Sequence, residues 1–239
     1  MNTEDLSARP HCILIGIGAG TGAACARRFS AEGYKVSMLA RSRERLARFA
    51  NDIEHTTPYR VDINELDEFR ATLEQMVADH GVPKVVIYNA TLATFTTYKE
   101  LAASDLERNF RVNTAGLMVA AQTLGPAMEA AQEGAIIVTG NTAALRGKPG
   151  YVGWSCTKAA QRNMAECLAR ELGPKGIHVA YVVIDAVIDM PFARRRWTDQ
   201  PEDFFAKPDD LAHEIYNVAH QPRSAWSFAV ELRPFGEVW

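Results

Sequence analysis

Short apolar runs alternate along the chain with longer segments in which apolar and charged residues repeat at helical spacing. The short runs are apolar on both faces, which is typical of strands in a parallel sheet that is covered on both sides. The runs that we expect to be strands are residues 11–16, 34–40, 57–63, 84–90, 134–140, 177–184 and 227–232. The expected helices are residues 21–33, 43–53, 65–81, 101–132 and 152–172, with a further helix start near Asp209 and Asp210.

This alternation predicts the fold class. Crossovers between parallel strands are right-handed in nearly all proteins, so strands and helices in this order build a doubly wound sheet. We therefore expect a Rossmann-like α/β fold, in which about seven parallel strands form the middle layer of an α/β/α arrangement.

The chain shows one long irregular segment and no linker, repeat or low-complexity region. We interpret residues 1–239 as a single dinucleotide-binding domain. Residues 185–208 connect the sixth strand to the next helix, and a connection of this length in a compact domain is often a lid or a binding element. We predict that this segment, named the flap below, is mobile and covers the substrate.

A glycine-rich loop follows the first apolar run and leads directly into a helix. It contains Gly16, Gly18, Gly20 and Gly22. Glycine lets the backbone turn tightly and approach a pyrophosphate, and the helix N-terminus offers N–H groups with a partial positive charge. Tight structural turns also use glycine, but the position of this loop at the head of a parallel sheet favours nucleotide binding.

The end of the second apolar run favours NADP over NAD. An NAD site has a carboxylate here that accepts a hydrogen bond from the ribose 2′-hydroxyl. This chain has Ala40 followed by Arg41 and Ser42, and an arginine suits a 2′-phosphate. Arg41 and Arg43 also fit a simpler role as solvated charges at a helix start. We predict that NADP(H) is preferred over NAD(H).

Composition and charge exclude several kinds of partner. With a formal net charge of −3, 47% hydrophobic residues and 23% charged residues, we expect no affinity for nucleic acid or an anionic membrane. Residues 1–10 are polar and acidic, unlike a signal peptide, and no apolar run reaches the roughly 18 residues that span a bilayer. The four cysteines lack CxxC spacing, so we expect reduced, mostly packed thiols and a cytoplasmic location. No metal site is expected, because His213 and His220 fit a solvated helix face better.

These motifs make the chain resemble the short-chain dehydrogenase/reductase family over nearly its whole length. Gly16, Gly20 and Gly22 fall on the three glycines of the family's T-G-x-x-x-G-x-G loop, with Ile15 at the threonine position. The family's other cofactor contacts correspond to Asp62, Ile63, Asn89, Ala90, Lys158 and Ile188. The resemblance also implies a small-molecule substrate and a homodimer or homotetramer, built through the final strand and the long helices.

The chain departs from the family where the substrate would bind. Family members reduce a carbonyl with a Y-x-x-x-K pair and an upstream serine; the tyrosine donates the proton, the lysine lowers the tyrosine pKa and holds the ribose, and a mid-helix asparagine positions a water relay. Here Lys158 and Asn113 match the lysine and the asparagine, but Trp154 replaces the tyrosine and Asn141 the serine. An indole N–H can donate a hydrogen bond but does not release its proton.

Three interpretations of this exchange stay open. Another group donates the proton, with Tyr151 as the candidate, or the substrate needs no proton at the hydride step, as with an iminium ion or an enone. In the third, the protein binds NADP without catalysis, as a sensor or scaffold subunit. Because the cofactor side is retained, we favour an oxidoreductase acting on a small organic carbonyl, imine or activated alkene. Lys158 would hold the ribose, Asn113 would brace Lys158 through water, and Asn141 and Trp154 would shape and hydrogen-bond the substrate.

Overall fold

A sheet of seven parallel strands lies at the centre of the computed structural model of the protein, which describes residues 8–236. The strand order is β3-β2-β1-β4-β5-β6-β9, and every neighbouring pair is parallel. The strands are β1 (His11–Ile15), β2 (Lys35–Ala40), β3 (Thr56–Arg60), β4 (Val85–Tyr88), β5 (Gly134–Asn141), β6 (Ile177–Ile184) and β9 (Ala229–Leu232). The predicted Rossmann-like sheet is confirmed, and the expected strands agree with the observed ones to within a few residues.

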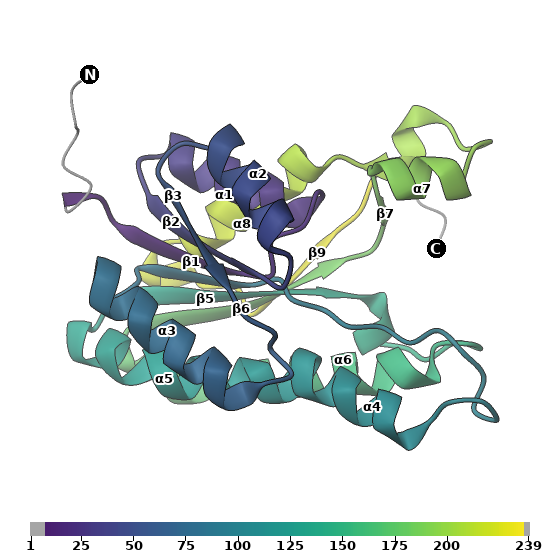
Figure 1. Cartoon of the computed structure of the whole chain (residues 1–239), viewed down its shortest axis with the longest axis horizontal. Coiled ribbons are helices and arrows are strands. Elements are labelled where there is room, and N and C mark those ends of the chain that lie inside the picture. The colour runs from purple at the N-terminus through teal and green to yellow at the C-terminus, as the bar shows by residue number, and fades with distance from the viewer. Residues whose placement is uncertain (1–7, 237–239) are drawn as a thin grey trace.

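Helices cover both faces of the sheet (Figure 1). On one face lie α1 (Thr21–Ala31), α2 (Arg43–Asp52) and α8 (Pro208–Ala219). On the other face lie α3 (Leu66–His80), α5 (Gly116–Ala131) and α6 (Val152–Leu172), with α4 (Ala103–Phe110) beside them. A π-helical turn, Arg111–Ala115, joins α4 to α5, so the expected continuous helix over 101–132 contains one widened turn.

The two faces of the sheet carry separate hydrophobic clusters, which explains why the strands are apolar throughout. In β1, Cys12 and Leu14 pack under α1 and α8, whereas Ile13 and Ile15 pack on the side of α3 and α5. All four side chains are fully buried. Each aliphatic side chain of this kind contributes about 1.5–3 kcal/mol through its burial, so a polar residue on either face would be costly.

The strand order places a crevice at the carboxyl ends of β1 and β4. The chain turns to one side of β1 for β2 and β3 and to the other side for β4 onward. The loops that follow β1 and β4 therefore run in opposite directions and leave space between them, where open α/β sheets bind their ligands. The glycine-rich loop after β1 lies at this point.

The flap is more regular than the sequence pattern indicates. Its residues form a small sheet of β7 (Val187–Ile188) and β8 (Phe205–Ala206), a short helix α7 (Pro191–Arg196) and a 3-10 turn at Glu202–Phe204. Arg194 holds these pieces together, because its guanidinium bonds Asp189 and Glu202 at 2.7 Å each and lies 4.1 Å from the centre of the Phe205 ring. The expectation of an irregular connection was therefore wrong. Charge pairs between residues five and eight positions apart help to order the segment, and hydrophobic periodicity does not register such pairs.

Two further expectations need comment. Cys12 and Cys25 are buried free thiols, as predicted, but Cys156 and Cys167 are exposed on α6, so the thiols are not mostly packed. Among residues 8–236, no helix has the length and apolar character needed to cross a bilayer. The expectation about a signal peptide concerns residues 1–10, and residues 1–7 lie outside the described part of the chain.

A buried histidine stands at the start of β1, at the opposite end of the sheet from the glycine-rich loop. His11 is 2% exposed; its Nδ1 donates to the carbonyl of Gly81 at 2.8 Å, and its Nε2 accepts from the hydroxyl of Ser37 at 2.8 Å. Burial lowers the pKa of His11 to about 4, and the neighbouring His80 acts in the same direction. The folded protein therefore holds His11 neutral at pH values where the unfolded chain protonates it.

This difference makes the stability pH-dependent. Because the folded-state pKa of His11 is below the unfolded value near 6.5, the stabilisation is complete above pH 6.5 and is lost as the pH falls toward 4. We expect His11 to account for a loss of about 2 kcal/mol in the free energy of unfolding between pH 6.5 and pH 5. Urea unfolding of the native chain and of His11→Gln at pH 7 and pH 5 measures it. Between pH 7 and pH 5, His11→Gln should lose less free energy of unfolding than the native chain. The control His213→Gln, which changes an exposed histidine, should lose as much as the native chain. Equal losses in His11→Gln and the native chain would contradict the assignment.

Candidate functional site

A cavity of about 660 Å³ opens at the carboxyl ends of β1, β2 and β4. Its wall contains every predicted cofactor residue except Lys158: Gly16, Gly18, Gly20, Gly22, Arg41, Ser42, Asp62, Ile63, Asn89, Ala90 and Ile188. The tertiary structure thus brings together residues from five separate segments. Cavities of this size commonly hold organic ligands.

The glycine-rich loop has the conformation that its residues allow. Gly16 has a φ of +94°, and a Cβ there would lie 2.6 Å from the backbone of Ala90, so no other residue fits. A Cβ on Gly22 would lie 3.0 Å from the carbonyl oxygen of Gly16, which explains how α1 starts so close to β1. The N-cap, Gly20, has no side chain to cap the helix, and the first turn of α1 contains no acidic residue. Ala23 and Ala24 donate their N–H groups to the carbonyls of Gly18 and Gly20, at 2.9 and 3.2 Å. Within the described part of the chain, the N–H groups of Thr21 and Gly22 are therefore the ones left to an anion in the cavity.

Asn89 holds the glycine-rich loop in place through its side-chain amide. Its Nδ2 donates to the carbonyl of Gly16 at 2.8 Å, and its Oδ1 accepts from the hydroxyl of Thr139 at 2.9 Å. Both ends of this amide are thus engaged by the protein. Asn89 shapes the cavity by holding β1, β4 and β5 together at their carboxyl ends.

Two arginines line the cavity where β2 ends. Arg41 was predicted from the sequence; Arg45, one turn into α2, was not, although its spacing from Ser42 on a helix start would have indicated it. The hydroxyl of Ser42 accepts from the backbone N–H of Arg45 at 3.2 Å and caps the helix. The carboxylate of Asp62, also in the cavity wall, accepts two hydrogen bonds of 3.0 Å from Asn64.

Lys158 lies behind the cavity wall and is 1% exposed. Its Nζ donates to the carbonyl of Thr139 at 3.1 Å and to the side-chain oxygen of Gln161. Burial lowers the pKa of Lys158 to about 7. Thr139 connects Lys158 to Asn89 of the cavity wall through two hydrogen bonds, since its carbonyl accepts from Lys158 and its hydroxyl donates to Asn89.

Asn113 is a buried residue of the π-helical turn. Its side chain bonds the backbone of Leu92 in both directions, at 2.9 and 2.8 Å, and donates to the hydroxyl of Thr157 at 2.8 Å. Its backbone carbonyl accepts from Gln161 Nε2 at 2.6 Å. The side chain of Gln161 thus links Asn113 to Lys158, and the additional link through water stays a prediction.

Trp154 directs its N–H to a residue of the cavity wall. Its Nε1 donates to the hydroxyl of Thr91 at 3.3 Å, and Thr91 lines the cavity. The indole packs edge-on against Phe95, with ring centres 5.1 Å apart, and lies 5.7 Å from Tyr151. Trp154 thus joins an aromatic group beside the cavity, and its hydrogen-bond donor is occupied.

The other two predicted substrate residues are Asn141 and Tyr151. Asn141 ends β5, and its Oδ1 accepts from the backbone N–H of Ala143 at 3.0 Å, capping a 3-10 turn. This leaves the Asn141 Nδ2 hydrogens as donors, since they bond no other residue in 8–236. Tyr151 is the N-cap of α6 and belongs to the aromatic group, because its ring packs edge-on against Phe95 with ring centres 4.9 Å apart. The ammonium group of Lys148 lies 4.1 Å from the centre of the Tyr151 ring.

The flap reaches the cavity through Ile188 and Met190. A Cβ on Gly20 would lie 2.5 Å from the Met190 sulfur, so the flap rests directly on the glycine-rich loop. Met190 is in the cavity wall but was not among the cofactor residues predicted from the sequence. Its position covers the mouth of the cavity near the first turn of α1.

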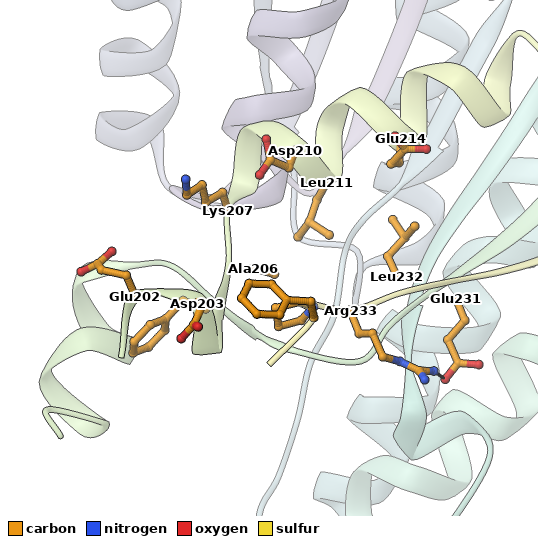
Figure 2. Close-up of a pocket in the computed structure, with 13 residues that line it drawn as sticks. Glu202, Asp203, Ala206, Lys207, Asp210, Leu211, Glu214, Glu231, Leu232 and Arg233 are labelled. Atoms are coloured by element: carbon orange, nitrogen blue, oxygen red, sulfur yellow. Dashed lines mark hydrogen bonds and ion pairs between the residues drawn. The ribbon is translucent and has the colours of Figure 1, made fainter. Parts of the chain in front are cut away.

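A second cavity, of about 1040 Å³, lies between the flap, α8 and the end of β9. Figure 2 shows Glu202, Asp203 and Lys207 on one side of it and Arg233, paired with Glu231, on the other. Carboxylates outnumber cations in its wall, which also contains Asp210 and Glu214. This charge disfavours an anionic dinucleotide, so the smaller cavity at the glycine-rich loop is the candidate nucleotide site.

Comparison with known proteins agrees with this geometry. The model of a family described as short chain dehydrogenase matches residues 10–200. The versicolorin reductase stcU of Emericella nidulans is 30% identical over 182 residues, covering 73% of this chain and 68% of that protein. The crystal structure of a short-chain dehydrogenase from Rhodopseudomonas palustris is 30% identical and covers 95% of this chain and 99% of its own, with a TM-score of 0.82.

A more distant structure shares the fold. A metagenomic short-chain oxidoreductase in complex with NADP is 22% identical, with a TM-score of 0.83, and covers 96% of this chain and 99% of its own. The match of the family model spans the glycine-rich loop, the cavity wall and α6. The chain therefore belongs to the short-chain dehydrogenase family and is an oxidoreductase.

Proposed function

We propose that this oxidoreductase uses NADP(H) to transfer hydride to or from a small organic carbonyl, imine or activated alkene. The observation that carries the proposal is one cavity whose wall joins the glycine-rich loop to Arg41 and Arg45. A dinucleotide needs an anion-binding turn for its pyrophosphate, and an NADP site needs cations for the 2′-phosphate. Both features lie in the same wall.

The residues at the end of β2 fit the phosphorylated ribose. Arg41 and Arg45 both line the cavity, and guanidinium groups bind phosphate with two parallel hydrogen bonds. No carboxylate follows β2 directly, so this position lacks the acceptor that an NAD site provides for the ribose 2′-hydroxyl. The distantly similar oxidoreductase that was solved with NADP shares this fold, which is consistent with the same type of cofactor here.

The nicotinamide cofactor, when bound, supplies or accepts the hydride. The first turn of α1 would hold the pyrophosphate, and Asn89 keeps the loop in place for it. Lys158 has two of its N–H groups engaged by Thr139 and Gln161 and retains one for a ribose hydroxyl. The first turn of α1, Asn89 and Lys158 thus bind and orient the cofactor, and in this proposal none of them transfers a proton to the substrate.

The substrate side favours compounds that need little acid catalysis. Trp154 gives its N–H to Thr91, and the Asn141 amide can polarise a substrate oxygen or nitrogen without ionising. Tyr151 is the neighbouring hydroxyl, and we retain it as the candidate donor. An imine that arrives as its iminium ion, or an enone that is protonated afterwards by water, suits this arrangement better than an unactivated ketone.

Titration of the purified protein with NADPH and with NADH, followed by nicotinamide fluorescence, tests the proposal. We expect NADPH to bind at least tenfold more tightly than NADH, because charge-assisted hydrogen bonds to a phosphate contribute about 1.5–3 kcal/mol. NADPH oxidation should then be detectable with cyclic imines or enones before it is detectable with simple ketones. Binding of neither cofactor would overturn the proposal.

We also propose that the protein forms a homodimer or homotetramer. The strand β9 stands at the edge of the sheet and pairs only with β6 among the described residues. An unpaired edge is commonly covered in the assembled protein.

A further inference from the structure

Gln161 is a fully buried amide on the inner face of α6. Residues 158, 161, 165, 168 and 172 repeat at helical spacing and are all buried, so Gln161 occupies a position that the pattern reserves for apolar residues. It is 0% exposed. A buried amide without partners costs several kcal/mol, roughly 2–7 by transfer measurements, so its contacts have to explain its presence.

Both ends of the amide are bonded, and the partners determine its orientation. Nε2 donates to the backbone carbonyl of Asn113 at 2.6 Å, and Oε1 accepts from Lys158 Nζ. The backbone carbonyl of Asn113 can only accept, so Nε2 has to face it and Oε1 has to face Lys158; the amide therefore cannot be reversed. Gln161 is therefore a rigid bridge between the π-helical turn and Lys158.

The far end of this bridge is itself immobile. The Asn113 side chain bonds Leu92 twice and Thr157 once, which fixes the backbone at Asn113 against both the loop after β4 and α6. The bridge thus connects Lys158 to the segment Asn89–Leu92, which lines the nucleotide cavity. A displacement of Gln161 would therefore change the position of Lys158 directly, because the two side chains are hydrogen-bonded.

Lys158 depends on two oxygen atoms for its orientation. Nζ donates to the Thr139 carbonyl of β5 at 3.1 Å and to Gln161 on α6. From β6, the Tyr181 ring faces it with its centre 6.0 Å from Nζ. No carboxylate in residues 8–236 pairs with it, and burial is the cause that shifts its pKa. With two N–H directions set by fixed acceptors, the third direction is set as well.

We propose that Gln161 is a positioning residue for Lys158, which aims the remaining N–H of Lys158 at a ribose hydroxyl of the bound dinucleotide. The inference rests on the proposed function for its ligand, but its geometry is independent of the ligand. It assigns a role to a residue outside the cavity wall, acting through Lys158 and not by contact with the cofactor.

A double-mutant cycle tests the proposal. Gln161→Met keeps the volume but removes both hydrogen bonds, and Lys158→Met removes the ammonium. We expect each single change to weaken NADPH binding about tenfold, in keeping with the loss or misdirection of one hydrogen bond. In the Lys158→Met background, Gln161→Met should have no further effect, because its route to the cofactor is gone. Met164→Leu, on the same helix but outside the network, is the matched control and should bind NADPH like the native chain.

A second measurement needs no cofactor. The carbon Cε of Lys158, labelled with 13C and assigned by its absence in Lys158→Arg, reports the pKa of this ammonium in NMR titrations. Gln161→Met removes an acceptor and should lower that pKa, whereas Gln161→Glu places a carboxylate beside Nζ and should raise it. Met164→Leu should leave it unchanged. These opposite shifts would establish the hydrogen bond between Gln161 and Lys158 in the folded protein. If the role of Gln161 were merely structural, neither variant would shift the pKa of Lys158.

The two measurements separate the possible failures. If the native chain binds neither NADPH nor NADH while the NMR shifts occur, the proposed function fails and the bridge to Lys158 stands. If NADPH binds but Gln161→Met weakens it equally with and without Lys158, Gln161 does not act through Lys158. Unchanged pKa values in both Gln161 variants would also overturn the inference.

Discussion

Replacing Arg41 and Arg45 by alanine together is expected to lower the affinity for NADPH about 100-fold, since each guanidinium contributes about 1.5 kcal/mol through charge-assisted hydrogen bonds to the 2′-phosphate. The affinity for NADH should change by less than about threefold, because its 2′-hydroxyl gives a guanidinium little to bind. Both arginines line the cavity directly after β2. Fluorescence titration with both cofactors measures the difference.

Arg43 provides a control within the same turn. It lies between the two arginines in the sequence but outside the cavity wall, so Arg43→Ala removes the same charge without removing a contact. We expect this variant to retain NADPH binding within about threefold, apart from a weak effect that salt screens. A matching loss in Arg43→Ala, or an equal loss for NADPH and NADH in the double variant, would contradict the assignment of the 2′-phosphate site.

Exchange of Trp154 for tyrosine together with Asn141→Ser is expected to create ketone reductase activity, at least 100-fold above the native chain, since general acid catalysis contributes roughly 10²–10⁴-fold. Position 154 lies one helical turn before Lys158, so a phenol there would approach the ammonium. Serine can replace Asn141 as the cap of the 3-10 turn, because its hydroxyl also accepts from a backbone N–H. NADPH oxidation with a panel of aryl ketones measures the gain.

The matched control separates a proton donor from a change of shape. Trp154→Phe with Asn141→Ser places the same ring at position 154 without its hydroxyl, and it loses the bond to Thr91 in the same way. We expect this variant to stay close to the native activity toward ketones. Equal gains in the two double variants would show that space at position 154, and not acid catalysis, limits the reaction.

The fold and the nucleotide cavity followed from the sequence because local patterns encode them. Strands such as β1 are apolar on both faces, and this pattern has one common solution, a covered parallel sheet. The carboxyl ends of parallel strands then lie on one edge, which placed the loop of Gly16 there, and the resemblance to the family assigned Asp62 and Asn89 to the same site. Cavity residues that lie outside the quoted motifs, such as Arg45, were missed.

The flap shows where local patterns stop being informative. Its small sheet depends on Arg194 meeting Asp189 and Glu202, and charge pairs between short segments leave no periodicity in the sequence. Similarly, Trp154 lies in the first turn of α6 and Thr91 in the loop after β4, and only their contact in the fold shows that the indole N–H is bonded.

The parallel sheet, the site at its carboxyl edge and the presence of Trp154 in place of a tyrosine could all be read from the sequence, because each depends on residue type and spacing along one segment. The burial of Lys158 and its bond to Gln161 could not be read in this way. Gln161 lies on the inner face of α6, whereas its partner Asn113 lies in the π-helical turn before α5. Hydrogen bonds between side chains of separate elements depend on how those elements pack, and packing is a property of the whole chain.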